Sequence, residues 1–211
     1  MKLLPVLCLT LALTACQSAY YSTLSAFGVQ KRDILVERVE EGRDAQAEAK
    51  EEIQTTLAAF QAFEDFDGGE LESLYNKLKD QLDRAEDRVS DVGGRIDSIE
   101  RVAGDLFEEW ETELDQFENE DLKRRSRTTY DQTRDRYERL IDAMRKAESL
   151  MQPVLSVFRD HVLFLKHNLN AAAIASLEND LVSIETDVAE LISEMEASIA
   201  EADAFISTLD S

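Results

Sequence analysis

The sequence predicts an all-α protein, folded as an elongated antiparallel four-helix bundle with coiled-coil-like packing. Two observations lead to this prediction. The 211-residue chain contains only seven Gly and two Pro, and 32% of its residues are charged, a composition typical of long helices. Apolar residues also recur at alternating steps of three and four along four stretches of the chain, which is the spacing of helices that pack side by side.

Residues 1–15 have the pattern of a lipoprotein signal peptide. Lys2 supplies the positive charge near the start, and the apolar run that follows is too short to span a bilayer. The run ends in Leu13-Thr14-Ala15-Cys16, which resembles the lipobox of bacterial lipoproteins. That resemblance implies that Cys16 is acylated and becomes the first residue of the mature chain. The alternative is an ordinary secretory signal followed by a free thiol.

We expect residues 16–30 to form an anchor and membrane-proximal segment, and residues 31–211 to form the helical bundle domain. Several acyl chains on Cys16 would hold the protein stably on a membrane, whereas a single chain gives marginal binding. Gln17 follows the cysteine, and the lack of Asp there suggests the outer membrane in lipoproteins of this kind. The predicted location is the bacterial outer membrane, lipid-anchored and facing the periplasm.

The first two helices are predicted over residues 35–63 and 71–117. The first has the weaker seam, with small and polar residues at several inward positions. Between the two, Asp67 and Glu70 flank a Gly pair at the spacing of a capping box. In the second stretch Gly93-Gly94 interrupts no part of the apolar pattern, and it predicts a bend or a flexible point within the helix.

The third and fourth helices are predicted to follow a turn near Asn119, which is a plausible N-cap. Pro153 should kink the third helix or restart it. The apolar pattern then slips in phase near Asn168-Leu169-Asn170 and continues over residues 174–209. A turn with Asn170 as N-cap explains the slip, and a continuous, locally distorted helix is the alternative.

Four stretches of similar length joined by short turns favour an up-down-up-down arrangement. A helix of about 48 residues would be about 70 Å long, so the expected shape is a rod. Bases outnumber acids over residues 122–148, while the stretches before and after are acidic. The basic third helix is therefore predicted to lie between two acidic neighbours.

Three stretches resemble a family of proteobacterial lipoproteins known only as a domain of unknown function. They are YYSTLSAFGVQKRDILVERV, VAGDLFEEWETELDQF and MQPVLSVFRDHVLFLKHNLNAAAIASL. The resemblance covers essentially the whole mature chain. It implies a helical, lipid-anchored protein, and it brings no substrate, cofactor or catalytic residue with it.

The sequence predicts a protein that is not an enzyme and has no cofactor. A net charge of −22 argues against nucleic acid as a partner. No phosphate-binding loop, dinucleotide fingerprint or nucleophile elbow occurs in the sequence. His161 and His167 are six residues apart, which is wrong for shared metal ligation on one helix face, so no metal site is expected.

The most apolar part of the mature chain, residues 154–165, suggests a place for a partner or a ligand. A helix that is apolar nearly all round is buried or meets another apolar body, and a thick bundle core is the simpler interpretation. The alternative is a groove near Phe158–Leu169 that binds apolar ligands. The candidate residues for a partner or a ligand are Phe158, His161, Phe164, His167, Asn168 and Asn170.

The basic cluster Lys123, Arg124, Arg125 and Arg127 is a candidate membrane-surface site. In an up-down-up-down bundle, the turn before it lies at the same end as the tethered N-terminus. Bases there could face lipid headgroups, each contributing about 1 kcal/mol at an anionic surface. The alternative is that they pair with neighbouring acids, namely Glu118, Glu120 and Asp121.

These features predict a non-enzymatic, lipid-anchored structural or adaptor protein of the cell envelope. It would bind an unidentified protein or envelope partner through its helical rod. A carrier or chaperone for apolar ligands is the alternative function. Long seams can also pair between chains, so a homo-oligomer is possible.

Overall fold

The computed structural model describes residues 31–62, 71–168 and 171–209, and it confirms the predicted all-α four-helix fold. The helices are α2 (Lys31–Gln61), α3 (Leu71–Leu114), α4 (Glu120–His167) and α5 (Ala171–Leu209). Cys16, the capping box at Asp67 and Glu70, and Asn170 lie outside the described residues. The predictions that concern them remain predictions.

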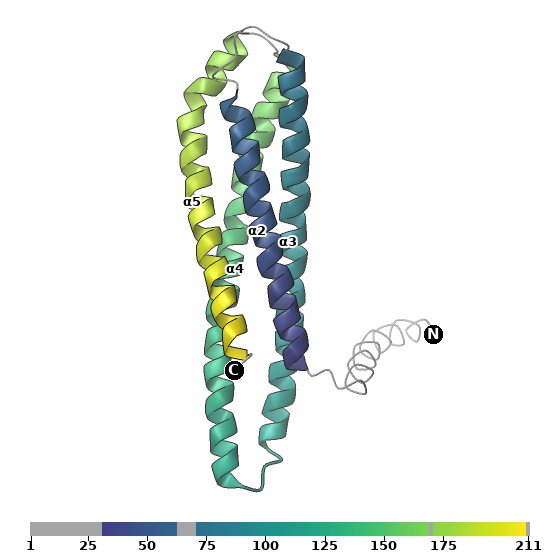
Figure 1. Cartoon of the computed structure of the whole chain (residues 1–211), viewed down its shortest axis with the longest axis vertical. Coiled ribbons are helices and arrows are strands. Elements are labelled where there is room, and N and C mark those ends of the chain that lie inside the picture. The colour runs from purple at the N-terminus through teal and green to yellow at the C-terminus, as the bar shows by residue number, and fades with distance from the viewer. Residues whose placement is uncertain (1–30, 63–70, 169–170, 210–211) are drawn as a thin grey trace, which may run out of the picture.

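The helices run alternately up and down and form a closed ring (Figure 1). The main contacts join α2 to α3, α3 to α4, α4 to α5 and α5 back to α2. The basic α4 therefore lies between α3 and α5, as its charge predicts. With 48 residues at 1.5 Å each, α4 is about 72 Å long, so the molecule is a rod.

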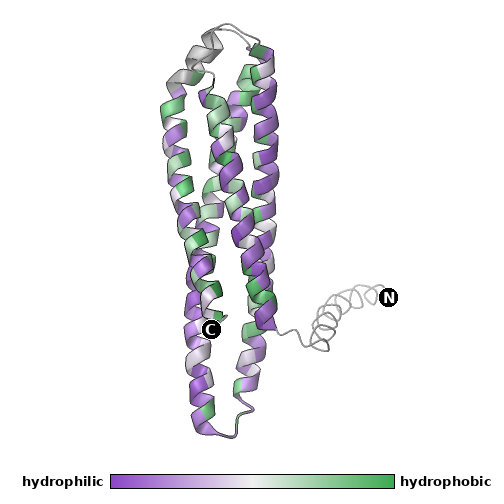
Figure 2. Ribbon diagram, in the orientation of Figure 1, coloured by the Kyte–Doolittle hydropathy of each residue, from purple (hydrophilic) through white to green (hydrophobic). Residues whose placement is uncertain are grey.

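The predicted apolar seams form the core. Every described seam position of α2 is buried, including Gly42, Gln46 and Thr56. On α4 and α5 the seam is buried along nearly its whole described length, with Tyr137 and His161 partly buried. Hydrophilic residues cover much of the outward surface (Figure 2). The core therefore runs along the rod as stacked layers and does not gather in one central cluster.

The predicted start of α4 is confirmed at Asn119. Its side-chain oxygen accepts hydrogen bonds from the backbone N–H groups of Asp121 at 2.9 Å and Leu122 at 3.1 Å, which are otherwise unpaired donors of the first turn. At the other end, α4 stops at His167 and α5 begins at Ala171. The phase slip in the sequence therefore marks a true break between two helices.

α3 continues through Gly93 and Gly94, and α4 continues through Pro153. Pro153 therefore kinks the helix or leaves it straight but does not restart it, and the bend or flexible point at the Gly pair stays a prediction. The neighbouring helices explain both results. Buried residues flank each site, such as Val92 and Ile96 on α3 and Met151 and Val154 on α4, and their packing outweighs the unfavourable helix propensity of Gly and Pro.

The helices are also less similar in length than the sequence suggested. α2 has 31 residues, whereas α3 has 44 and α4 has 48. The first residue of α2, Lys31, lies beside α3, with its Nζ 3.2 Å from the carbonyl oxygen of Asp105 and 3.1 Å from a Glu109 carboxylate oxygen. The α3–α4 hairpin extends beyond this level (Figure 1). We call residues 110–130 the hairpin tip.

One core layer is polar. Ser198 of α5 donates a hydrogen bond of 2.8 Å to the side-chain oxygen of Gln46 on α2, and both side chains are fully buried. The Gln46 Nε2 has no hydrogen-bond partner among the described residues. A polar pair inside an apolar seam costs stability, but it can fix the register of two helices.

We expect Ser198→Ala to lower the free energy of unfolding by about 1 kcal/mol, because it leaves the Gln46 carbonyl buried without a donor. The double variant Gln46→Leu with Ser198→Ala should unfold at or above the wild-type denaturant midpoint. Urea unfolding followed by circular dichroism measures both. A double variant less stable than Ser198→Ala alone would contradict this explanation.

Candidate functional site

The basic cluster lies on α4 within the hairpin tip, and most of it is paired with acids. Lys123 Nζ lies 3.3 Å from an Asp115 carboxylate oxygen, and Arg127 lies 3.8 Å from a Glu111 carboxylate oxygen. Arg124 forms an ion pair with Asp121. Two of these three partners were not foreseen, because only the folded hairpin brings them beside the bases: Glu111 is on α3, and Asp115 directly follows its last residue. These ion pairs are exposed, and each contributes at most about 1 kcal/mol.

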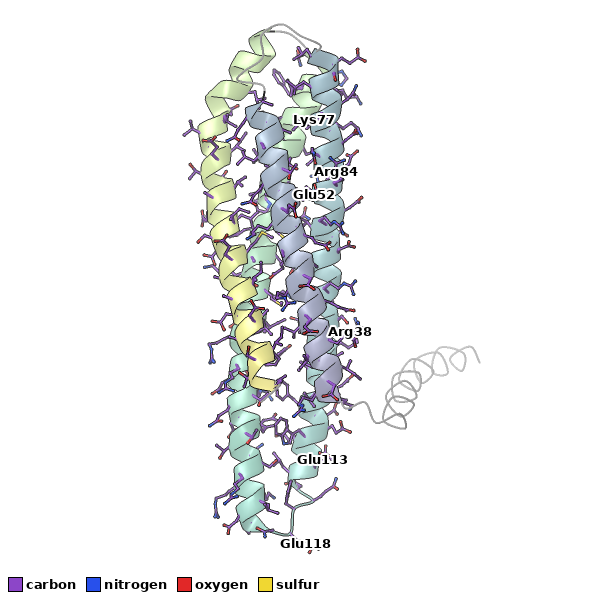
Figure 3. The ribbon with its side chains drawn as sticks, in the orientation of Figure 1. Arg38, Glu52, Lys77, Arg84, Glu113 and Glu118 are labelled. Atoms are coloured by element: carbon purple, nitrogen blue, oxygen red, sulfur yellow. The ribbon has the colours of Figure 1, made fainter. Side chains whose placement is uncertain are left out.

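Arg125 is the exception in the cluster. Among the described residues, no carboxylate lies within ion-pair distance of its guanidinium. The tip as a whole is nevertheless acidic, with carboxylates that include Glu113 and Glu118 near its end (Figure 3). Contact between the cluster and anionic headgroups stays a prediction, and the ion pairs give the other three bases a structural role.

Aromatic side chains hold the tip together. The Trp110 indole N–H of α3 donates a 2.9 Å hydrogen bond to the hydroxyl of Ser126 on α4. The Tyr130 ring packs edge-on against Trp110 and against Phe107, with ring centroids 5.6 Å apart in each case. The Arg127 guanidinium lies 5.4 Å from the centroid of the Tyr130 ring, a cation–π contact. The tip is therefore a packed two-helix extension of the bundle.

An open hollow of about 310 Å³ lies between the two helices of the tip. Its lining is mostly charged: Glu111, Leu114, Asp115, Glu120, Lys123, Arg124 and Arg127. Three carboxylates and three basic side chains line it, so it has no single sign of charge to attract an ion. No Ser, Thr, Cys or His side chain lines this hollow.

Of the six candidate residues at the other end, the five that the structure describes do not form one site, and Asn170 lies outside the described residues. Phe158 is fully buried and stacks on Phe60 of α2, with ring centroids 4.9 Å apart and ring planes at 17°. His161 is partly buried, with its ring 6.0 Å from that of Phe60 and its Nε2 4.0 Å from an Asp180 carboxylate oxygen of α5. Phe158 thus belongs to the core, which is the simpler interpretation that the sequence offered.

The remaining candidates lie at the surface. Phe164 is 44% exposed and its neighbour Leu163 is 56% exposed. His167 is exposed at the last turn of α4, and Asn168 ends the helix by donating its side-chain N–H to the Phe164 carbonyl oxygen at 2.9 Å. Sequence reasoning missed Leu163 as a surface residue, although it falls between the seam positions of α4. Leu163 and Phe164 form the exposed apolar pair of this end.

A charged cluster that the sequence did not single out joins α3 to α4 at mid-length. The Arg145 guanidinium binds Asp97 at 2.6 Å, Glu100 at 2.5 Å and Glu148 at 2.7 Å. Hydrogen bonds to Glu100, then to Asp97 and Glu148, raise the pKa of Arg145 further above its usual value. The i, i+3 spacing of Asp97 and Glu100 was the available signal. The cluster acts as a clamp between helices.

The raised pKa of Tyr137 leads us to expect a loss of stability at high pH. Burial, with a further contribution from Glu100, raises the pKa of its phenol from 10.0 to about 12. The unfolded chain therefore releases this proton first, and the stabilisation that is full below pH 10 falls as the pH rises toward 12. Tyr137→Phe should flatten this part of the stability profile, measured by urea unfolding between pH 9 and about 12. Identical profiles for the two proteins would contradict the assignment.

Across residues 31–62, 71–168 and 171–209, no three His, Cys, Asp or Glu side chains are grouped in a way that could hold a metal ion. Within the same residues, no helix combines the length and the apolar character needed to cross a bilayer.

The chain matches no curated protein sequence and no solved structure. A comparison with protein families matches residues 20–209 to the family described as protein of unknown function (DUF2959). The match begins ahead of α2 and ends with the last residue of α5. This chain therefore belongs to that family of proteins of unknown function.

Proposed function

We propose that this protein is a non-enzymatic bacterial lipoprotein that stands on the outer membrane and extends a helical rod into the periplasm. The proposal combines the lipobox-like sequence at Cys16 with the rod. It also agrees with the resemblance to proteobacterial lipoproteins. Its function would be that of a structural or adaptor protein, joining the membrane to a protein or another component of the envelope.

One geometric observation carries this proposal. α2 begins at Lys31, in the half of the rod that also contains the hairpin tip (Figure 1). Fourteen residues separate Lys31 from Cys16, and such a segment spans no more than about 50 Å even when extended. A lipid on Cys16 would therefore keep the hairpin end near the membrane and direct the other end away from it.

The distal end has a surface suited to a partner. Leu163 and Phe164 are exposed on the last turns of α4, about 60 Å from the hairpin end of that helix. Exposed apolar side chains next to each other often mark contacts with other proteins. We propose that a periplasmic or envelope protein binds here.

Photo-crosslinking in intact cells tests this proposal, with matched positions at the two ends of the rod. A crosslinking amino acid replaces Leu163 in one variant and Leu122 in the other. Both residues are exposed leucines of α4, at 56% and 49%. We expect a discrete protein adduct from position 163, which disappears when Phe164→Ser is added, and none from position 122. Equal adducts from both positions, or no protein adduct from position 163, would rule out a distal partner.

A further inference from the structure

We propose that the distal partner of this protein binds through an acidic segment, which lies along the α3–α4 seam beside Leu163 and pairs with Lys79 and Lys166. We call these three residues the distal basic surface. The site rests on the proposed function, in which a partner binds this end of the rod, and the charges of the surface define the chemistry of that partner.

Ion pairs between α3 and α4 follow one pattern. Among the described residues, the acid comes from the α3 side and the base from α4 in every ion pair that joins them. Two of these pairs are Glu100 with Arg145 at 2.5 Å and Glu86 with Arg159 at 2.6 Å. On each helix the two members are two heptads apart, so the register of α3 against α4 is kept along this length.

The next heptad step towards the distal end breaks the pattern. Seven residues further along each helix are Lys79 on α3 and Lys166 on α4, so a base faces a base where the pattern would place an acid opposite a base. Their sequence neighbours Leu78 and Leu165 are 0% and 1% exposed, so both helices are still packed into the bundle at this level. Two positive charges at facing positions repel each other.

The positive charge is only partly compensated within the protein. Lys79 Nζ lies 2.6 Å from a carboxylate oxygen of Asp83 on its own helix, whereas no carboxylate of the described residues lies within ion-pair distance of Lys166. Leu163 is three residues before Lys166, on the same face of α4, and is 56% exposed. A segment with carboxylates next to an apolar side chain would therefore meet both an unpaired base and an exposed leucine.

Other anionic partners fit this surface less well. In the proposed orientation, Lys166 is about 65 Å from the hairpin end of α4, so lipid headgroups at that end do not reach it. A second copy anchored to the same membrane would stand alongside and bring the same lysines to the same height, where they would repel each other. An acidic segment of another envelope protein is therefore the partner that these charges favour.

Photo-crosslinking from position 163 in intact cells tests this inference with three charge variants. Lys166→Glu should lower the yield of the protein adduct at least about fivefold, because it replaces attraction to an acidic segment by repulsion. Lys166→Arg keeps the charge and should leave the yield within about twofold. Lys77→Glu is the matched control, because Lys77 is also exposed near the distal end of α3 (Figure 3) but lies about 160° around the helix from Lys79.

Urea unfolding of the purified variants separates binding from stability. Lys166→Glu places an acid opposite Lys79 and so supplies the missing pair. We therefore expect its denaturant midpoint to stay within about 0.3 M of the wild-type value, although the adduct is lost. An adduct yield that falls only together with the midpoint would contradict the proposal.

The possible results distinguish this inference from the proposed function. If position 163 gives no protein adduct in the otherwise wild-type chain, both are wrong. If an adduct forms but Lys166→Glu leaves its yield unchanged, or Lys77→Glu lowers it equally, a distal partner exists and the acidic segment is wrong. Peptide mapping should place the crosslink in a segment with more Asp and Glu than Lys and Arg. An adduct to lipid, to a second copy or to a segment without excess acid would overturn the inference as well.

Discussion

Phe158→Ala is expected to lower the free energy of unfolding by about 3–5 kcal/mol, the range for removing a buried aromatic ring. Phe158 is fully buried and stacks on Phe60 at a centroid distance of 4.9 Å, so the substitution also removes an aromatic contact between α4 and α2. Relaxation around the site would fill little of the space, because both helices are held along their whole described length. Urea unfolding followed by circular dichroism measures the loss.

Phe164→Ala is the matched control, six residues further along the same helix. Phe164 is 44% exposed, and we expect its removal to cost less than about 1 kcal/mol. Comparing the two variants also distinguishes a core role of Phe158 from a role in lining a ligand groove. If Phe158 lined an open ligand groove, its removal would cost little stability, and the two variants would behave alike.

Gly42→Leu is expected to destabilise the bundle by about 1–3 kcal/mol through overpacking. A Cβ atom at this position would lie 2.7 Å from the terminal methyl group of Ile99 on α3 and 3.4 Å from the terminal methyl group of Met144 on α4. Both neighbours are fully buried, so neither has free space to enter. The lack of a side chain at Gly42 is what lets α2 approach its neighbours closely.

The same substitution at Gly94 should instead stabilise the protein, raising its free energy of unfolding. A Cβ atom there would meet no atom within 4 Å, and leucine favours the helix over glycine by about 0.5–1 kcal/mol. The two variants are compared by their denaturant midpoints. Equal shifts in the same direction would show that helix propensity, rather than packing at Gly42, decides the result.

The helices and their inward faces could be predicted from the sequence because each depends on local spacing. The apolar period placed Leu140, Met144 and Met151 in the core, and Asn119 signalled the start of α4 through its own side chain. Gln46 and Ser198 lie in the predicted seams, but their pairing depends on the register of α2 against α5. Local spacing contains no information on that register.

Other features of the structure could not be predicted from the sequence, because they depend on contacts between segments that are distant in the chain. Pro153 and Gly93 have low helix propensity, and only the packing of the neighbouring helices keeps α3 and α4 continuous there. The partner of Arg127 is on α3 and that of Lys123 directly follows it, in the tip that the unequal helix lengths create.

Mass spectrometry of the mature N-terminal peptide tests the central claim most directly, because the orientation of the rod depends on the anchor. The account predicts a peptide that begins at Cys16 and contains a thioether-linked diacylglycerol. A mature chain that begins at another residue, or that has a free thiol at Cys16, would contradict it.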